Sequence, residues 1–247
     1  MSYLRFGEGK RVLVILPGIS FRRVSDNPEP VVNAFEPYAK DRDIYLFDRK
    51  DDMKSPYTVR EMAEDTIRAM EELGIRKADF YGASQGGMIC QYIAIEHPEM
   101  IKKMVIASSA PYVSYQALPF FERISELVKE KDPRSLMRYS LSQIYSKEFY
   151  DKYKDQVMES HKDLSDEDIE RFGIMVEDTN IYILDKLAKA DVKAMVVAAT
   201  GDKIFGIDPT LQMAYAMNCE CVIYDGYSHA VYDEAEDFKE RLFNFLG

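Results

Sequence analysis

The fold of this chain is decided by one stretch of its sequence, which reads Ala78-Asp79-Phe80-Tyr81-Gly82-Ala83-Ser84-Gln85-Gly86-Gly87-Met88. The chain has only 12 glycines in 247 residues, and three of them lie within six positions here. At this composition, chance gives roughly 0.04 occurrences of the pattern Gly-x-Ser-x-Gly. An apolar run precedes the pattern and a helical apolar spacing follows it. The stretch therefore predicts a sharp turn from a strand into a helix.

This turn can present Ser84 as a nucleophile. A sharp strand-to-helix turn is crowded, so Gly82 and Gly86 stand where a Cβ atom would clash. Such a turn lifts the Ser84 hydroxyl clear of the backbone. It also aims the first amides of the helix at any oxygen that develops negative charge. The alternative interpretation is an ordinary glycine-rich turn ahead of a helix.

Apolar runs on both sides of this stretch predict a sheet. They are nearly continuous rather than alternating, which is typical of parallel strands buried on both faces. We expect strands at residues 11–16, 43–47, 78–81, 103–107, 193–199 and 219–224. Helical patterns lie between them, and Thr58 with Glu61 indicates a capping box at the start of one helix. This alternation predicts an α/β fold whose mostly parallel, twisted sheet is covered by helices on both faces.

The alternation breaks between residues 112 and 190. This stretch contains several helical patterns and no convincing strand, and the strand signals resume at Lys193. We therefore expect residues 112–190 to form an inserted helical lid, or cap, on a core domain made of residues 1–111 and 191–247. A chain of this length fits one such domain and buries a sufficient core without disulfides.

Together these segments resemble the α/β-hydrolase superfamily. Residues 82–87 are similar to its nucleophile elbow and residues 13–19 to its early strand and oxyanion loop. Residues 43–49 are similar to the next strand with its Asp-Arg turn, and residues 112–190 occupy the usual place of a lid. The resemblance spans nearly the whole chain. It implies the α/β-hydrolase fold with an inserted helical cap and a chain order of nucleophile, acid and histidine.

Only three histidines compete for the role of catalytic base. His97 ends a predicted helix, where a cation is favourable for the helix alone. His161 lies among charged residues of the expected lid. His229 follows the last predicted strand, and the resemblance places the base there. The alternative is a structural His229 without a catalytic role.

The acidic residue departs from the family pattern. The family places it just past the preceding strand, usually three residues after a glycine, but the third residue after Gly201 is Ile204. Asp202 and Asp208 flank that place. We prefer Asp202 because it directly follows the strand end, with Asp208 as the alternative acid; a third interpretation is an exposed loop acid. The choice matters, because the carboxylate sets the tautomer of the imidazole.

The resemblance also implies an oxyanion hole made of backbone amides. The candidates are the N–H groups of Gln85, just after the nucleophile, and of Ile19 in the turn Pro17-Gly18-Ile19. Many relatives have His-Gly where this chain has Pro17-Gly18, but the amide of Ile19 stays available. Each such donor typically contributes about 3 kcal/mol to the transition state.

Composition excludes several other classes of function. A net charge of −11 repels phosphate and anionic headgroups, so we expect neither a nucleic-acid partner nor a membrane partner. Three cysteines give no disulfide or zinc pattern, and no apolar run is long enough for a signal peptide or a membrane span, so we expect a cytoplasmic protein. No dinucleotide or phosphate-loop motif is present, so we expect no cofactor and no metal. Residues 48–52 resemble a chelating run at first sight, but we interpret them as a charge-rich loop at a strand end.

These observations favour a serine hydrolase that acts on a small carboxylic ester or a related acyl compound. Ser84 would attack the acyl carbon, His229 would move the proton, and an acyl-enzyme would form. The expected partner is therefore a small-molecule acyl substrate, and no pattern indicates an oligomeric state. The alternatives are an acyltransferase, a C–C bond hydrolase on the same fold, or a catalytically impaired ligand-binding protein.

Overall fold

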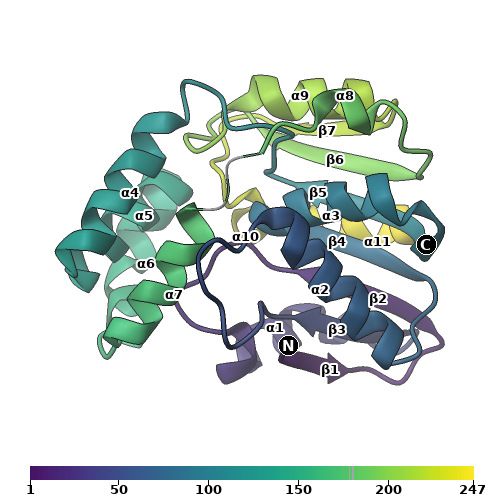
Figure 1. Ribbon diagram of the computed structural model, residues 1–247, viewed down its shortest axis with the longest axis horizontal. Helices are drawn as coiled ribbons and strands as arrows, with labels where there is room; N and C mark the ends of the chain where they lie inside the picture. The colour runs from purple at the N-terminus through teal and green to yellow at the C-terminus, as the bar shows by residue number, and fades with distance from the viewer. Residues whose placement is uncertain (178, 180) are drawn as a thin grey trace.

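A computed structural model describes residues 1–177, 179 and 181–247. Within these residues the chain forms a seven-stranded sheet with the order β1-β3-β2-β4-β5-β6-β7 (Figure 1). Only the first pair, β1 with β3, is antiparallel among the strand pairs described. The strands are β1 (Tyr3–Phe6), β2 (Arg11–Leu16), β3 (Arg42–Phe47), β4 (Ala78–Ala83), β5 (Ile101–Ala107), β6 (Ala194–Ala199) and β7 (Glu220–Tyr224). The predicted α/β fold with a mostly parallel sheet is confirmed.

Helices cover both faces of this sheet, because successive strand residues point to opposite sides. On one face Val14 and Phe80 belong to a core shared with α2 (Val59–Glu72), α3 (Gln85–Glu96), α8 (Leu184–Leu187) and α9 (Ile207–Ala216). On the other face Leu13 and Tyr81 share a core with α1 (Glu29–Phe35), α10 (Val231–Glu234) and α11 (Phe238–Leu246). Short 3-10 turns lie at Val24–Asp26, Glu36–Tyr38 and Pro98–Met100.

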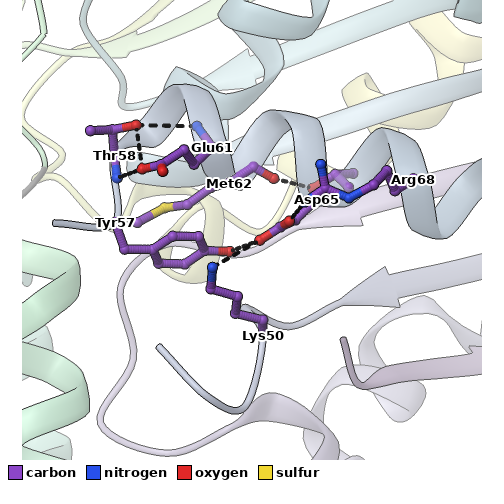
Figure 2. A network of polar contacts seen from close by, with 8 residues as sticks. Lys50, Tyr57, Thr58, Glu61, Met62, Asp65 and Arg68 are labelled. Atoms are coloured by element: carbon purple, nitrogen blue, oxygen red, sulfur yellow. Dashed lines mark hydrogen bonds and ion pairs between the residues drawn. The ribbon is translucent and has the colours of Figure 1, made fainter. Parts of the chain in front are cut away.

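The start of α2 confirms the predicted capping box (Figure 2). The Glu61 N–H donates to Oγ1 of Thr58 at 3.2 Å, and the Thr58 N–H donates to the Glu61 carboxylate at 2.8 Å. Tyr57 directly precedes the cap, and its hydroxyl donates at 2.8 Å to Asp65, which lies one turn beyond Glu61. Lys50 pairs with the same carboxylate at 3.7 Å. The N-terminus of α2 is thus fixed to the loop that follows β3.

Between β5 and β6 the chain forms a group of helices beside one end of the sheet (Figure 1). They are α4 (Leu118–Glu130), α5 (Pro133–Ile144), α6 (Lys147–Ser160) and α7 (Asp166–Glu177). Buried side chains from α4, α5 and α7, among them Ile124, Leu136 and Phe172, form a separate small core that also contains Phe21. We call residues 112–190 the helical segment, whose last helix, α8, already packs on the sheet; that the segment acts as a lid stays a prediction.

Candidate active site

Ser84 lies on a strained turn between β4 and α3. Its φ of 53° and ψ of −122° are rare for a residue with a side chain. The flanking glycines have the predicted steric reason: a Cβ on Gly86 would lie 1.9 Å from the Leu16 carbonyl oxygen. A Cβ on Gly82 would lie 2.5 Å from the Gly86 carbonyl oxygen. The close packing of β2, β4 and α3 therefore holds Ser84 in this conformation.

His229 and Asp202 form a buried hydrogen-bonded pair. Nδ1 of His229 lies 2.9 Å from Oδ2 of Asp202, and the two residues are 3% and 8% exposed. Oδ1 of Asp202 accepts the N–H groups of Ile204 at 2.8 Å and Phe205 at 3.1 Å, which fixes the carboxylate. A proton on Nδ1 leaves Nε2 of the ring as a free acceptor. Asp208, the alternative acid, is exposed in the first turn of α9.

Two loops at the carboxyl edge of the sheet bring this pair together. The Gly201 N–H donates to the Tyr227 carbonyl at 2.9 Å, and a Cβ on Gly201 would lie 2.7 Å from the same oxygen. The backbones after β6 and β7 therefore touch. Ile204, at the position where the family pattern expects the acid, instead supplies a backbone donor to Asp202. Asp202 thus reaches His229, although it lies one residue after Gly201 rather than three.

Ser84 and His229 line one cavity of about 80 Å³. Ile19 and Gln85, the predicted oxyanion donors, line it too, together with Gly18. The rest of its wall is mostly hydrocarbon and comprises Phe21, Phe120, Phe121, Ser140, Ile144, Phe172, Val176, Thr179, Ile204, Phe205 and Tyr232. No Lys, Arg, Asp or Glu is among the described residues of this wall. The cavity suits a small, uncharged group held next to the Ser84 hydroxyl.

The two candidate oxyanion donors are adjacent to Ser84. The Gln85 N–H belongs to the first turn of α3, whose leading N–H groups have no acceptor within the helix. The turn that carries Ile19 packs against Ser84, since a Cβ on Gly18 would lie 3.1 Å from the Ser84 Cβ. Both amides can therefore serve a carbonyl oxygen of a molecule bound at Ser84.

The other two histidines lie elsewhere. His97 follows α3 and pairs with Glu99 at 3.5 Å. His161 follows α6 and lines a larger surface hollow of about 700 Å³ between α5 and α6. That hollow shares no lining residue with the Ser84 cavity and has several charged side chains on its wall. We identify the smaller cavity as the candidate site because Ser84 and His229 line it and the His229 ring is bonded to Asp202.

Sequence reasoning missed a buried charge beside the site. Residues 48–52 form a loop at the end of β3, as expected, but the sequence did not indicate that Asp48 and Arg49 are each only 3% exposed. The Arg49 guanidinium donates to the Pro17 carbonyl and to the Gln85 side chain. A charged run shows no periodicity that separates its buried members from its exposed ones. The Asp-Arg pair at the strand end is the one signal that points to them.

The helical segment is also attached to the loop that carries His229. The Ala230 N–H donates to the Ile144 carbonyl at 3.0 Å, and the Ser146 N–H donates to Glu234 at 2.8 Å. The Tyr145 hydroxyl donates to Asp233 at 3.1 Å. The junction of α5 and α6 is thus hydrogen-bonded to the residues that follow His229.

No group of three or more His, Cys, Asp or Glu side chains in the described part of the chain is arranged to hold a metal ion. No helix in the same residues has both the length and the apolar character needed to cross a membrane.

Known proteins share the fold of this chain. The family model described as the alpha/beta hydrolase fold matches residues 12–236. The 3-oxoadipate enol-lactonase 2 of Acinetobacter baylyi is 23% identical over 150 residues, which cover 60% of this chain and 55% of that protein. The serine hydrolase BPHL of Mus musculus is 27% identical over 134 residues, which cover 52% and 46%. The chain thus matches about half the length of these two relatives.

A solved structure extends the similarity over the whole chain. It is MGS-M2, an alpha/beta hydrolase enzyme from a Medee basin deep-sea metagenome library, with a TM-score of 0.89 and 20% sequence identity. The superposition covers 100% of this chain and 94% of that one. At this identity the likeness shows the fold, which is the one that the family model indicates.

Proposed function

This chain belongs to the alpha/beta hydrolase family, and from that premise we propose that it is a serine hydrolase that cleaves a small carboxylic ester or a related acyl compound. One observation carries the proposal: Ser84 and His229 line the same cavity, and Nδ1 of His229 is hydrogen-bonded to Asp202. A hydroxyl, an imidazole and a carboxylate in this order are the parts of a serine nucleophile with its general base.

The reaction follows from the roles that the geometry allows. Ser84 Oγ attacks the acyl carbon while Nε2 of His229 takes its proton and then passes it to the leaving alcohol. Asp202 holds Nδ1–H in place and stabilises the charged ring. The N–H groups of Ile19 and Gln85 bind the oxygen that becomes negative. His229 then activates a water molecule, which releases the acid and restores Ser84.

The cavity supports a small, uncharged acyl group as substrate. Its wall offers aromatic and aliphatic carbon and, among described residues, no ionised partner for a carboxylate or an ammonium group. The net charge of −11 adds a field that repels anions. Phe120, Phe172 and Val176 bring part of this wall from the helical segment. We therefore assign residues 112–190 the role of a lid over a core of residues 1–111 and 191–247.

The Asp202–His229 contact weighs against a catalytically impaired ligand-binding protein. The only sequence argument for impairment is the unusual place of the acid, and Asp202 lies within hydrogen-bond distance of the ring. The names of the relatives, an enol-lactonase and a serine hydrolase, support ester-type chemistry. An acyltransferase or a C–C bond hydrolase would use the same side chains, so the products separate these alternatives.

The test is covalent labelling of the folded protein with a small fluorophosphonate, followed by peptide mapping. We expect one modified residue, Ser84, and no labelling of Ser84→Ala at an unchanged circular dichroism spectrum. Hydrolysis of p-nitrophenyl acetate or butyrate with and without added alcohol then identifies water as the acyl acceptor. Absence of labelling and of turnover in the folded wild type would contradict a serine hydrolase.

A further inference from the structure

Arg49 carries a buried positive charge close to the candidate site. It lies just past β3 with 3% of its surface exposed, and burial lowers the pKa of its guanidinium to about 10. The group therefore remains protonated at neutral pH. Removing a guanidinium from water is costly unless its N–H groups find acceptors. The identity of these acceptors indicates what the side chain does.

Arg49 is held by two neutral oxygens rather than by a carboxylate. Among the residues that the structure describes, its Nη2 donates to the Pro17 carbonyl at 2.9 Å and to Oε1 of Gln85 at 3.2 Å. The adjacent acid, Asp48, uses its own carboxylate oxygens for the N–H groups of Val24 and Ser25 at 2.9 and 3.0 Å. Asp48 attracts the Arg49 charge without bonding to it, so the hydrogen bonds of the guanidinium go to neutral backbone and amide groups.

Both acceptors belong to the segments that carry the candidate oxyanion donors. Pro17 begins the turn that leads to Ile19, and Gln85 supplies the second amide. The segments also touch directly, because a Cβ on Gly86 would lie 2.7 Å from the Pro17 carbonyl oxygen. A single guanidinium thus joins the two halves of the oxyanion hole.

We propose that Arg49 is a positioning residue of the oxyanion hole, an inference that rests on the proposed function. Its two bonds fix the separation of the Ile19 and Gln85 amides. Its charge strengthens the attraction of these amides for an oxygen that becomes negative. Both effects are larger in the transition state than with the neutral bound ester. Arg49 therefore acts on kcat more than on KM.

The Gln85 side chain extends this connection to the helical segment. Its Nε2 donates to the Met175 carbonyl at 2.7 Å and to Oγ1 of Thr179 at 2.9 Å. Met175 lies in α7, which also contributes Phe172 and Val176 to the cavity. One set of hydrogen bonds therefore holds the oxyanion donors and a wall of the acyl pocket in register.

The experiment compares two substitutions of Arg49 by steady-state kinetics with a neutral short-chain ester. Arg49→Met removes the charge and both hydrogen bonds, and we expect kcat to fall by about 10- to 100-fold while KM changes by less than about threefold. Both hydrogen bonds come from Nη2, and Arg49→Lys keeps the charge on a side chain that ends one bond short of that nitrogen. We expect it to recover only part of kcat, and Gln85→Met, which keeps its backbone N–H, to lose a similar part.

Arg42 provides a matched control at the other end of β3. It is 4% exposed and donates to Asp79 at 2.9 Å and to the Gly247 carbonyl at 2.8 Å. Arg42→Met removes a guanidinium that is equally buried but is paired with a carboxylate and lies away from the cavity. It should lower the midpoint of urea unfolding and leave kcat of the folded enzyme within about twofold of wild type.

The outcomes separate the two proposals. An unchanged kcat in Arg49→Met overturns the positioning role. If that variant does not fold, wild-type kcat in both Arg49→Lys and Gln85→Met overturns it as well. A wild type that shows no turnover and no labelling of Ser84 contradicts the proposed function instead, whatever the Arg49 variants do.

Discussion

The sheet core and the helical segment differ in how completely their residues are fixed. Every residue of β4 and of β6 is buried, and the tight turns at the strand ends leave no room for a Cβ at Gly82 or Gly86. In the helical segment, α6 has no buried residue among those described, and the small core between the helices also draws on Phe21. The backbone is therefore specified more tightly in the core than in the segment.

The sheet core and the helical segment also contribute different parts of the candidate site. Ser84 and His229 follow strands of the core, and Asp202 follows another. The helical segment contributes walls such as Phe120 and Phe172. We therefore expect substitutions in the core to change the rate or the stability, and substitutions in the segment to change which substrate is accepted. Four predictions test this division, in order of decreasing effect.

The largest effect concerns the acid that the core places at His229. Asp202→Asn keeps the size of the side chain but removes the charge that stabilises the protonated imidazole, and we expect kcat to fall by about 10²- to 10⁴-fold. Asp208→Asn is the matched control and should stay within about twofold of wild type, since Asp208 is exposed. Steady-state ester hydrolysis measures both. A loss in Asp208→Asn as large as in Asp202→Asn would show that the wrong carboxylate has been assigned.

The second prediction compares one glycine from each region by urea unfolding. In Gly86→Ala the new Cβ would meet a backbone oxygen at 1.9 Å. The atoms in the way are backbone atoms of Leu16 and Pro17, which cannot move aside. We therefore expect the free energy of unfolding to fall by more than about 3 kcal/mol, or no folded protein. In Gly173→Ala of α7 the nearest atom is the side-chain Cγ1 of Val128 at 2.7 Å, which can rotate away. A gain in helix propensity offsets that cost, so the change should stay within about 1 kcal/mol. Equal losses would remove the contrast between the regions.

The third prediction concerns the wall of the cavity. Phe172 stacks on Phe21 with ring centroids 4.4 Å apart and is 6% exposed. Phe172→Ala should raise the ratio of kcat/KM for octanoate to butyrate esters by about tenfold, because each added methylene in an apolar pocket gains about 1 kcal/mol or more. It should also destabilise the fold by about 3 kcal/mol. Phe149→Ala, in the same segment but outside the cavity, should leave the ratio unchanged. A shift of equal size in both variants would contradict a specific wall.

The smallest effect is expected at the capping box of α2, far from the reacting groups. Thr58→Ala removes the acceptor for the Glu61 N–H and should lower the free energy of unfolding by about 1 kcal/mol without changing kcat.

The hydrogen bonds from Thr58 lower the pKa of Glu61 in the folded state. Glu61 therefore stabilises the fold above its unfolded pKa, and this contribution is lost as the pH falls through the lowered value. The difference between wild type and variant should shrink on acidification. Thr58→Ser, which keeps the hydroxyl, should behave like wild type.

Much of the fold could be predicted, because it depends on local patterns. All six predicted strands occur as β2 to β7, and the capping box of α2 is present. The edge strand β1 was not predicted. It has four residues that alternate between exposed and half-buried, so it lacks the continuous apolar run of the central strands. Its pairing with β3 is a long-range contact that no local pattern encodes.

The candidate site was predictable only where one residue type is scarce. Three histidines and a single glycine-flanked serine turn left few choices for Ser84 and His229. Carboxylates are abundant, and the spacing from Gly201 pointed to Ile204. The contact between the loops after β6 and β7 selects Asp202 over Asp208. The burial of Arg49 likewise depends on which segments pack over it.

Six of the seven strands and the tight turn at Ser84 could be read from the sequence alone. These depend on apolar spacing and on glycines where a Cβ does not fit, both of which are properties of neighbouring residues. Tertiary structure alone decided which acid meets His229, which charge is buried beside the oxyanion donors and which side chains line the cavity. Each of these joins residues from separate loops, and a distance between loops exists only once the sheet has brought their ends together.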